Sequence, residues 1–206
     1  TQGARAYAYL HDKRGFTDET MRHFKLGSGG NKYGPAVAIP YLTSTSCRGV
    51  KYRTLDPADD KQRFTREEGY EHPLFNGDAL EGEFRAVILT EGEIDAISLT
   101  QYDLGMPVVS LPNGASSFDP EICAAPLVHF DEIFLATDAD SKGEEAASKI
   151  ADKLGAFRCR RVRMPSPHKD ANECLVAGVS REDMIAVFQS ASAFGVSAVT
   201  GAPCSE

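Results

Sequence analysis

Two stretches of the same design decide the fold: residues 86–95 read AVILTEGEID, and residues 133–140 read IFLATDAD. Each opens with a run of apolar residues without polar alternation, which is typical of a strand buried on both faces. Each run changes abruptly to carboxylates, and a helical pattern follows. Strand-then-helix repetition predicts a parallel sheet whose strands are joined by crossover helices.

The carboxylates of the two stretches are expected at one edge of this sheet. Glu91 directly follows the first strand, and Asp138 and Asp140 follow the second. Open α/β sheets bind ligands beyond the carboxyl ends of their strands, where the strand order reverses. Carboxylates that meet there repel one another, so we expect a cation among them, and ligation by oxygen alone favours Mg²⁺ or Mn²⁺.

Two more acids extend this predicted metal site. Asp95 lies one helical turn beyond Glu91, and Asp170 lies in a predicted loop after a fourth strand at residues 158–164. Mg²⁺ usually takes one or two carboxylates besides water and phosphates, so the whole set suits two ions, or one ion with outer acids acting through water. Two ions would activate a 3′-hydroxyl and stabilise a leaving pyrophosphate.

The acids also have an ordinary structural interpretation. Glu91 and Asp95 would then be acids at the start of a helix, and Asp138 and Asp140 would be turn residues. Either motif alone is more often structural. The occurrence of both motifs after two strands, in this order, favours the metal site.

The composition bounds the class of protein. The 206 residues carry 22 basic and 30 acidic side chains, a formal net charge of −8, which counts against tight metal-free binding of nucleic acid. The five cysteines form no Cys-x-x-Cys pair, which argues against a zinc ribbon or a disulfide framework and fits the reducing cytoplasm. No apolar run reaches membrane-spanning length, so we expect no membrane partner.

The N-terminal region is expected to form a small α+β subdomain. Strands are predicted at residues 36–42 and 50–55, behind two short helices, and residues 28–31 are predicted to form a loop. A turn after the second strand suggests that a third strand returns beside it.

Basic residues alternate along this region. Lys51 and Arg53 share one face of the second strand, and Lys61 and Arg63 repeat the two-residue spacing on the expected third strand. A solvated strand face is the alternative interpretation. Because the basic face is narrow, lies in an acidic chain and precedes the carboxylates, we interpret Lys51, Arg53 and Lys61 as phosphate-binding.

The sequence resembles, at three places, the Toprim domain that primases and topoisomerases share. These places are TEGEID at residues 90–95, DAD at residues 138–140 and KDANE at residues 169–173. The resemblance is strongest to the primase half of phage primase-helicases and their Twinkle-type relatives, which PVVSLPNGAS at residues 107–116 also resembles.

The resemblance implies an α/β fold in which a Toprim parallel sheet with flanking helices follows a small α+β basic subdomain. We expect the subdomain at residues 1–82, the Toprim domain at residues 83–190 and a tail at residues 191–206. Three stretches are similar, less specifically, to the basic subdomain of the primase core: VKYR at residues 50–53, KQRF at residues 61–64 and PLFN at residues 73–76.

For function, the resemblance implies a DNA primase polymerase core. Such a nucleotidyltransferase synthesises RNA primers on a single-stranded DNA template from ribonucleoside triphosphates, with Mg²⁺ or Mn²⁺. The implied residues are Glu91, Asp138 and Asp140 as metal-dependent catalytic acids, Asp95 and Asp170 as further metal ligands, and Lys51, Arg53 and Lys61 as nucleotide-binding residues.

Two motifs of the wider family are missing. Phage primases carry a zinc module and their helicase half carries a Gly-x-x-x-x-Gly-Lys-Ser/Thr loop, and neither pattern occurs in this sequence. We therefore expect a polymerase core that is fused to or bound by a replicative helicase, or a relative that has lost priming. Two rival functions stay open: a Toprim nuclease or topoisomerase fragment, although no tyrosine stands in a context that marks a nucleophile, and a non-catalytic DNA-binding scaffold of a helicase.

Overall fold

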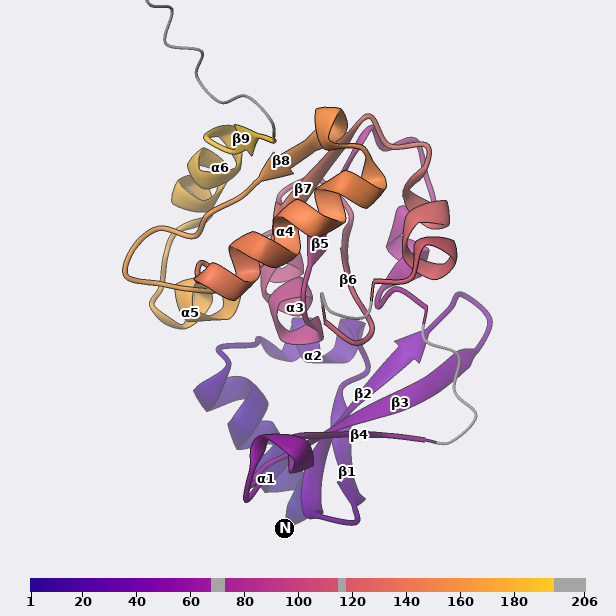
Figure 1. Ribbon diagram of the computed structural model, residues 1–206. Helices are drawn as coiled ribbons and strands as arrows, with labels where there is room; N and C mark the ends of the chain where they lie inside the picture. Colours follow the sequence, from indigo (N-terminus) through magenta and orange to yellow (C-terminus); the bar gives the residue numbers. More distant parts are fainter. Residues whose placement is uncertain (68–72, 115–117, 195–206) are drawn as a thin grey trace, which may run out of the picture.

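Two sheets, one above the other, make up the protein (Figure 1). The computed structural model describes residues 1–67, the N-terminal part, and residues 73–114 and 118–194, the C-terminal part. In these described residues no helix is both long and apolar enough to cross a membrane.

The N-terminal part packs short helices against an antiparallel sheet. Its helices are α1 (Gln2–Ala8), which continues as the π-helical turn η1 (Tyr9–Lys13), and α2 (Asp18–His23). Its strands are β1 (Gly27–Asn31), β2 (Gly34–Leu42), β3 (Cys47–Thr54) and β4 (Phe64–Arg66), and the 3₁₀ turn η2 (Asp60–Gln62) precedes β4. The strands pair antiparallel in chain order.

Two expectations for this part were wrong. Residues 28–31 belong to β1 and not to a loop, because they pair with β2. The sequence did not indicate this strand, since a glycine-rich segment lacks the alternating apolar side chains that mark one. The glycine at position 29 is needed there, since a Cβ on Gly29 would stand 2.6 Å from the ring of Tyr52. The strand expected after the basic second strand is β4, which begins only at Phe64. Lys61 therefore lies in η2 and not in a strand.

The C-terminal part is a five-stranded sheet with helices on both faces. Its strands are β5 (Ala86–Thr90), β6 (Val108–Ser110), β7 (Glu132–Ala136), β8 (Cys159–Arg161) and β9 (Ser192–Ala193). Its helices are α3 (Glu93–Gln101), α4 (Ser141–Leu154), α5 (Ala171–Val176) and α6 (Arg181–Gln189). Its shorter turns are η3 (Gly77–Leu80), η5 (Pro120–Ala124), η6 (Ala125–Leu127) and η7 (Ala156–Arg158).

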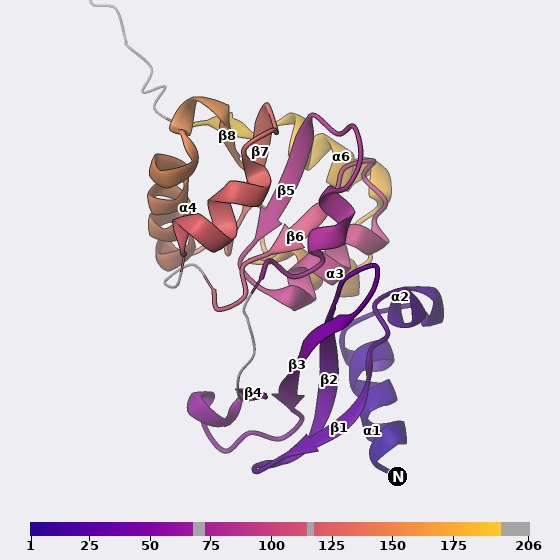
Figure 2. The same cartoon turned by 90° about the vertical axis from the view of Figure 1, so that its right-hand side faces the viewer.

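The strand order is β6-β5-β7-β8-β9, and only β9 runs antiparallel to its neighbour. A mostly parallel sheet that follows a small antiparallel one confirms the predicted fold class. Figure 2 shows α4 on one side of this sheet and α6 on the other. Because helices cover both faces, the central strands are apolar on both, as the run at residues 86–90 predicts.

The buried side chains form two cores. The first core joins the N-terminal part to the α3 face of the parallel sheet and includes Ile39, Ile88 and Ile97. The second core lies on the α4 face and includes Leu89 and Ile150. The first core therefore crosses between the two sheets, whereas the second belongs to the C-terminal part alone.

Phe75 lies where the first core crosses between the sheets. Its side chain is 1% exposed, and its ring stacks on Phe24 at 5.5 Å and meets Tyr41 edge to face at 5.3 Å between centroids. Its N–H donates to the carbonyl of Ser110 at 3.0 Å, and the N–H of Ser110 donates back at 3.3 Å. One residue thus connects the C-cap of α2 with β2 and β6.

We predict that Phe75→Ala lowers the free energy of unfolding by about 3–5 kcal/mol, because it leaves a cavity between the two sheets. Urea denaturation measures the change. Phe84→Ala is the matched control: Phe84 is 40% exposed, and its loss is expected to change the free energy by no more than about 0.5 kcal/mol. Equal effects of the two variants would contradict a shared core.

Candidate active site

The predicted acids gather at the carboxyl edge of the parallel sheet. Glu91 follows β5, and Asp138 and Asp140 follow β7. The two strands are neighbours, paired in parallel up to Thr90 and Ala136, so their ends coincide. The fold therefore brings together acids that lie more than forty residues apart in the sequence.

Backbone N–H groups orient three of the carboxylates. Asp140 and Asp170 cap α4 and α5, and Oδ1 of each accepts a hydrogen bond from the N–H three residues on, at 2.9 and 2.7 Å. Oδ1 of Asp95, in the first turn of α3, accepts from the N–H of Asn172 at 3.2 Å. Helix starts suit acids because their free N–H groups and dipoles favour negative charge.

The charges of three other acids of the cluster act on the carboxyl group of Asp138. Burial, followed by the charges of Glu91, Asp170 and Asp140, raises its pKa to about 6, although the charge of Lys169 opposes the rise. Nζ of Lys169 lies 3.7 Å from Oδ2 of Asp138. Asp138 therefore links the acids that follow both strands with the acid that caps α5.

Asp95 carries the largest shift among the acids. Burial, followed by the charges of Asp170 and Asp138, raises its pKa to about 8, against the Asn172 N–H and the charge of Arg14. Backbone N–H groups lower the pKa of Asp140 instead. The cluster thus contains groups that resist ionisation together.

These residues fit a hydrated divalent cation. In residues 1–67, 73–114 and 118–194, no three His, Cys, Asp or Glu side chains are gathered closely enough to enclose a metal ion. The donors at the edge are carboxylate oxygens that repel one another, which is the donor set of Mg²⁺ or Mn²⁺. Mg²⁺ keeps several of its waters and needs only one or two carboxylates, so an open cluster suits it better than a closed cage.

Lys51 brings the basic strand to this edge. Its Nζ donates to Oε1 of Glu93 at 2.6 Å and to the carbonyl of Pro112 at 3.3 Å, and Tyr41 also donates to Glu93. The side chains of Lys51 and Glu93 are 8% and 2% exposed. Burial lowers the pKa of Lys51, and the charge of Glu93 opposes that effect. Lys51 therefore joins β3 to the start of α3.

The other two predicted basic residues lie in different settings. Arg53 donates to the hydroxyl of Tyr9, and its guanidinium lies over the rings of Tyr9 and Phe64, 5.5 and 5.0 Å from their centroids. Lys61 is exposed on η2. The structure thus places Lys51 beside the acid edge, the sheet edge that carries Glu91, Asp138 and Asp140. Arg53 lies over two aromatic rings, and Lys61 lies on the surface.

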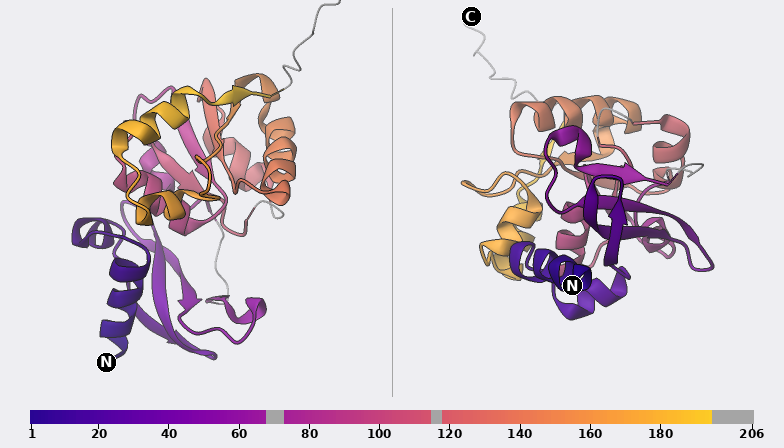
Figure 3. Two further views of the ribbon diagram at one scale, coloured as in Figure 1. Left: turned by 90° about the vertical axis from the view of Figure 1, so that its left-hand side faces the viewer. Right: turned by 90° about the horizontal axis from the view of Figure 1, so that it is seen from below.

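Sequence reasoning missed Arg14 and Asn172. Arg14 donates to Tyr9 at 2.8 Å and to Oδ1 of Asn172 at 3.0 Å, and Nδ2 of Asn172 donates to Ser98 at 3.0 Å. Arg14 directly follows η1, and Figure 3 shows the gold segment with α5 and α6 above the indigo N-terminal helices. Asn172 belongs to the KDANE motif, which was the available signal, whereas nothing in the local spacing of Arg14 indicates its distant partner.

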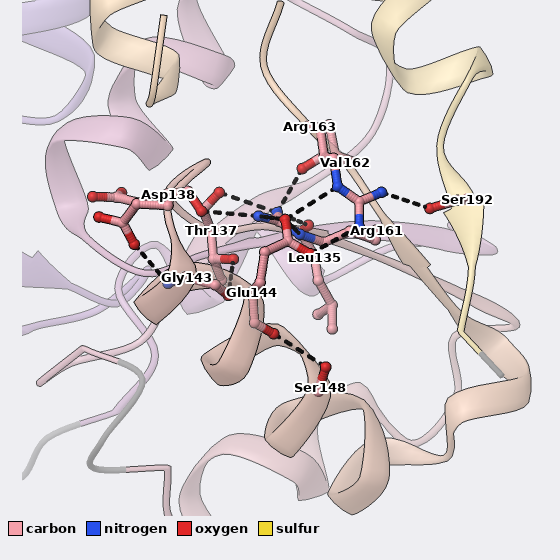
Figure 4. Close-up of polar contacts among 11 residues, drawn as sticks. Leu135, Thr137, Asp138, Gly143, Glu144, Ser148, Arg161, Val162, Arg163 and Ser192 are labelled. Carbon is pink, nitrogen blue, oxygen red and sulfur yellow. Dashed lines mark hydrogen bonds and ion pairs between the residues drawn. The ribbon is translucent and has the colours of Figure 1, made fainter.

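The peptide of Asp138 lies tightly against the first turn of α4 (Figure 4). A Cβ on Gly143 would stand 2.7 Å from the Asp138 carbonyl carbon and closer still to its oxygen. The hydroxyl of Thr137 donates to the Gly143 carbonyl at 2.8 Å. Glycine at this position therefore permits the approach that places Asp138.

Comparison with known proteins identifies this arrangement. Residues 88–175 match the family model described as Toprim-like. The Gene 57 protein of Mycobacterium phage D29 is 31% identical over 165 residues, which are 74% of this chain and 97% of that protein. The primase domains of bacteriophage T7, solved with an RNA/DNA hybrid, dTTP and DNA polymerase, align with a TM-score of 0.71 and 28% identity over 89% of this chain and 91% of theirs. The chain belongs to the Toprim primase family.

The DNA helicase/primase of Enterobacteria phage T3 is 40% identical to this primase core over 98 residues. The match covers 46% of this chain but only 17% of the phage T3 protein. The primase core described here therefore corresponds to one part of such a protein. Toprim domains generally bind divalent metal ions, in agreement with the donor set at the sheet edge.

We predict that Gly143→Ala destabilises the primase core by about 1–3 kcal/mol, because the added Cβ displaces the Asp138 peptide. Alanine normally stabilises a helix position relative to glycine by roughly 0.5–1 kcal/mol, so the expected sign is the reverse of the usual one. Gly77→Ala is the control, since a Cβ there meets nothing within 4 Å. Thermal unfolding of both variants checks this, and a stabilised Gly143→Ala protein would contradict it.

We predict that the metal-free primase core loses stability as the pH rises from about 4 to about 8. Asp95 and Asp138 have raised pKa values of about 8 and about 6, so the folded chain binds more protons than the unfolded chain in this window. Urea denaturation in a chelator at several pH values measures the slope. Asp95→Asn is expected to flatten the slope above about pH 6. A slope that the substitution leaves unchanged would contradict the shifted pKa of Asp95.

Proposed function

We propose that the chain synthesises short RNA primers on single-stranded DNA from ribonucleoside triphosphates, with Mg²⁺ or Mn²⁺. The observation that carries the proposal is the joining of a basic strand to the acid edge within a primase-type fold. Lys51 of β3 ends 2.6 Å from Glu93, which lies between the acids Glu91 and Asp95 in the sequence.

In this proposal, Glu91, Asp138 and Asp140 hold the metal, and Asp95 and Asp170 support them. The bound ion would supply charge neutralisation at the triphosphate and lower the pKa of the attacking 3′-hydroxyl. The protein orients Asp140 and Asp170 through helix caps, and in the metal-free chain burial raises the pKa of Asp95 to about 8. Lys169 adds one positive charge beside Asp138.

The nucleotide phosphates would meet the basic residues of the N-terminal part. Lys51 uses two of its three ammonium donors, on Glu93 and Pro112, which leaves one for a phosphate oxygen. Arg53 uses one of its five donors on Tyr9, so its guanidinium retains most of its capacity. Lys61 is exposed and would contact the nucleotide or the template through charge alone.

The partners follow from the same proposal. The template is single-stranded DNA, and the net charge of −8 implies that this chain alone binds it weakly, because the counterion release that drives most such binding is small. The phage T3 relative is by name both helicase and primase. We therefore propose that a replicative helicase, fused or bound, holds the template near this core in the cytoplasm.

The test is incorporation of labelled ribonucleotides on single-stranded DNA with Mg²⁺ or Mn²⁺, run beside a plasmid-nicking assay. We expect extension without nicking. Nicking alone would support a Toprim nuclease or topoisomerase fragment, and DNA binding with neither activity would support a helicase scaffold.

Asp138→Asn is expected to lower incorporation by at least about 100-fold, since it removes a charge that holds the metal. Asp152→Asn, on the exposed face of α4, is the matched control and is expected to retain activity. Both variants are expected to stay folded by circular dichroism. Full activity in Asp138→Asn would refute the assignment of the acid edge as the active site.

A further inference from the structure

Arg161 lies where β7 and β8 stop pairing. Its side chain is 2% exposed, and the parallel ladder between the two strands ends at Leu135 and Arg161. Beyond that point the chain leaves the sheet at Thr137 and Asp138. Carbonyl groups that leave a ladder inside a protein need another donor.

The Arg161 guanidinium supplies a donor to each of the two carbonyls past the end of β7, those of Thr137 and Asp138, and also bonds carbonyls within the ladder (Figure 4). Nη1 donates to the carbonyls of Leu135 at 3.2 Å, Thr137 at 3.1 Å and Val162 at 2.6 Å. Nη2 donates to the carbonyl of Asp138 at 2.9 Å. One side chain therefore continues the sheet for two residues past its end, up to the first acid of the DAD motif.

Glu144 of α4 fixes the other side of the guanidinium. Nε of Arg161 donates to Oε1 of Glu144 at 3.0 Å, and Nη2 lies 2.8 Å from the same oxygen. Burial by itself would raise the pKa of the Glu144 carboxyl, but hydrogen bonds from Arg161 and Arg163 hold this pKa below its ordinary value. With these contacts, all three nitrogens of Arg161 are engaged.

A buried guanidinium adds little net stability at a strand position, because its desolvation offsets much of the free energy that its ion pair contributes. An aliphatic side chain could pack there. Only arginine offers a planar group of five donors that reaches several carbonyls and a carboxylate at once. The same Asp138 carbonyl lies against Gly143 of α4, so its peptide is held from two sides.

We propose that Arg161 is a positioning residue of the acid cluster, which fixes the Asp138 peptide and thereby sets where Asp138 and Asp140 meet the metal and the triphosphate. This role rests on the proposed function. Arg161 does not itself touch the substrate. It acts through the backbone that carries the acids.

Arg163 offers a matched control on the same segment. It also bonds Glu144, at 3.1 and 2.8 Å, but its side chain is 56% exposed. Its remaining hydrogen bond goes to Ser192 Oγ at 3.0 Å, and it donates to none of the carbonyls of residues 135–138. A change at Arg163 thus removes a contact to Glu144 without releasing the Asp138 peptide.

The experiment compares Arg161→Lys with Arg163→Lys by three measurements: amide hydrogen exchange in the metal-free protein, Mn²⁺ affinity, and the kinetics of primer synthesis. In Arg161→Lys the amides of Ala139 and Gly143 are expected to exchange at least about 10-fold faster, while those of the β5 core stay unchanged. Mn²⁺ affinity and kcat are each expected to fall about 10–100-fold, with KM for the nucleotide nearly constant. Arg163→Lys is expected to match the wild type in all three.

Unchanged exchange at Ala139 and Gly143 would overturn the proposal, and so would a uniform rise across the domain, which indicates a merely structural role. If Arg161→Lys does not fold, Glu144→Gln replaces it, because it removes the charge that orients the guanidinium. It is expected to speed exchange at the same two amides about 3-fold, and no change there would equally overturn the proposal. A wild-type chain that makes no primers would contradict the proposed function, while the exchange data would still decide the role of Arg161.

Discussion

The repulsion among carboxylates confined to one sheet edge is the constraint on which the rest of the structure depends. Helices α3, α4 and α5 all begin at this edge, and the N–H groups at the starts of α4 and α5 hold Asp140, Asp170 and Asp95 in place. Lys169 and Arg14 add positive charge from two other segments. Even so, burial and like charge keep Asp95 and Asp138 reluctant to ionise. The cores elsewhere in the molecule must stabilise an arrangement that the acids oppose.

The buried pair of Lys51 and Glu93 is the second fixed point. Removing one member of a buried ion pair is more damaging than the pair is stabilising, because the other charge is left without compensation. The contact therefore adds little to stability. Its main effect is to fix the position of the antiparallel sheet β1–β4, called the basic sheet here, against the acid edge. It also means that Lys51 serves both the fold and, in the proposed function, the nucleotide. Lys61 is exposed, and in the proposed function it has only the role of binding the nucleotide or the template.

The sequence predicts the parts of this site that depend on strand order alone. Apolar runs followed at once by acids indicate where β5 and β7 end, and parallel strands that are neighbours end at the same edge. Burial that arises from distant partners is not visible in the same way. Arg161 stands in the predicted fourth strand with three other arginines, a composition that predicts a strand nearer an edge of the sheet, yet Glu144 and the carbonyls of the β7 loop enclose the Arg161 side chain. Likewise α5 lies in the segment that the sequence predicts to be a loop, and Asp170, a predicted metal ligand, caps this helix. The predicted boundaries of the two domains stay predictions.

The two cores divide the molecule differently from the two sheets. Since the first core runs from the N-terminal helices through Phe75 into the α3 face, Glu91 and Asp95 sit on elements that share their packing with the basic sheet. Asp138 and Asp140 instead precede α4, whose apolar face packs in the second core. A chimera that exchanged the N-terminal part between relatives at the sheet boundary would therefore cut through one core and leave the other whole. An exchange that keeps the first core whole would have to carry the α3 face together with the antiparallel sheet, so its boundary would pass between Asp95 on α3 and Asp138 after β7.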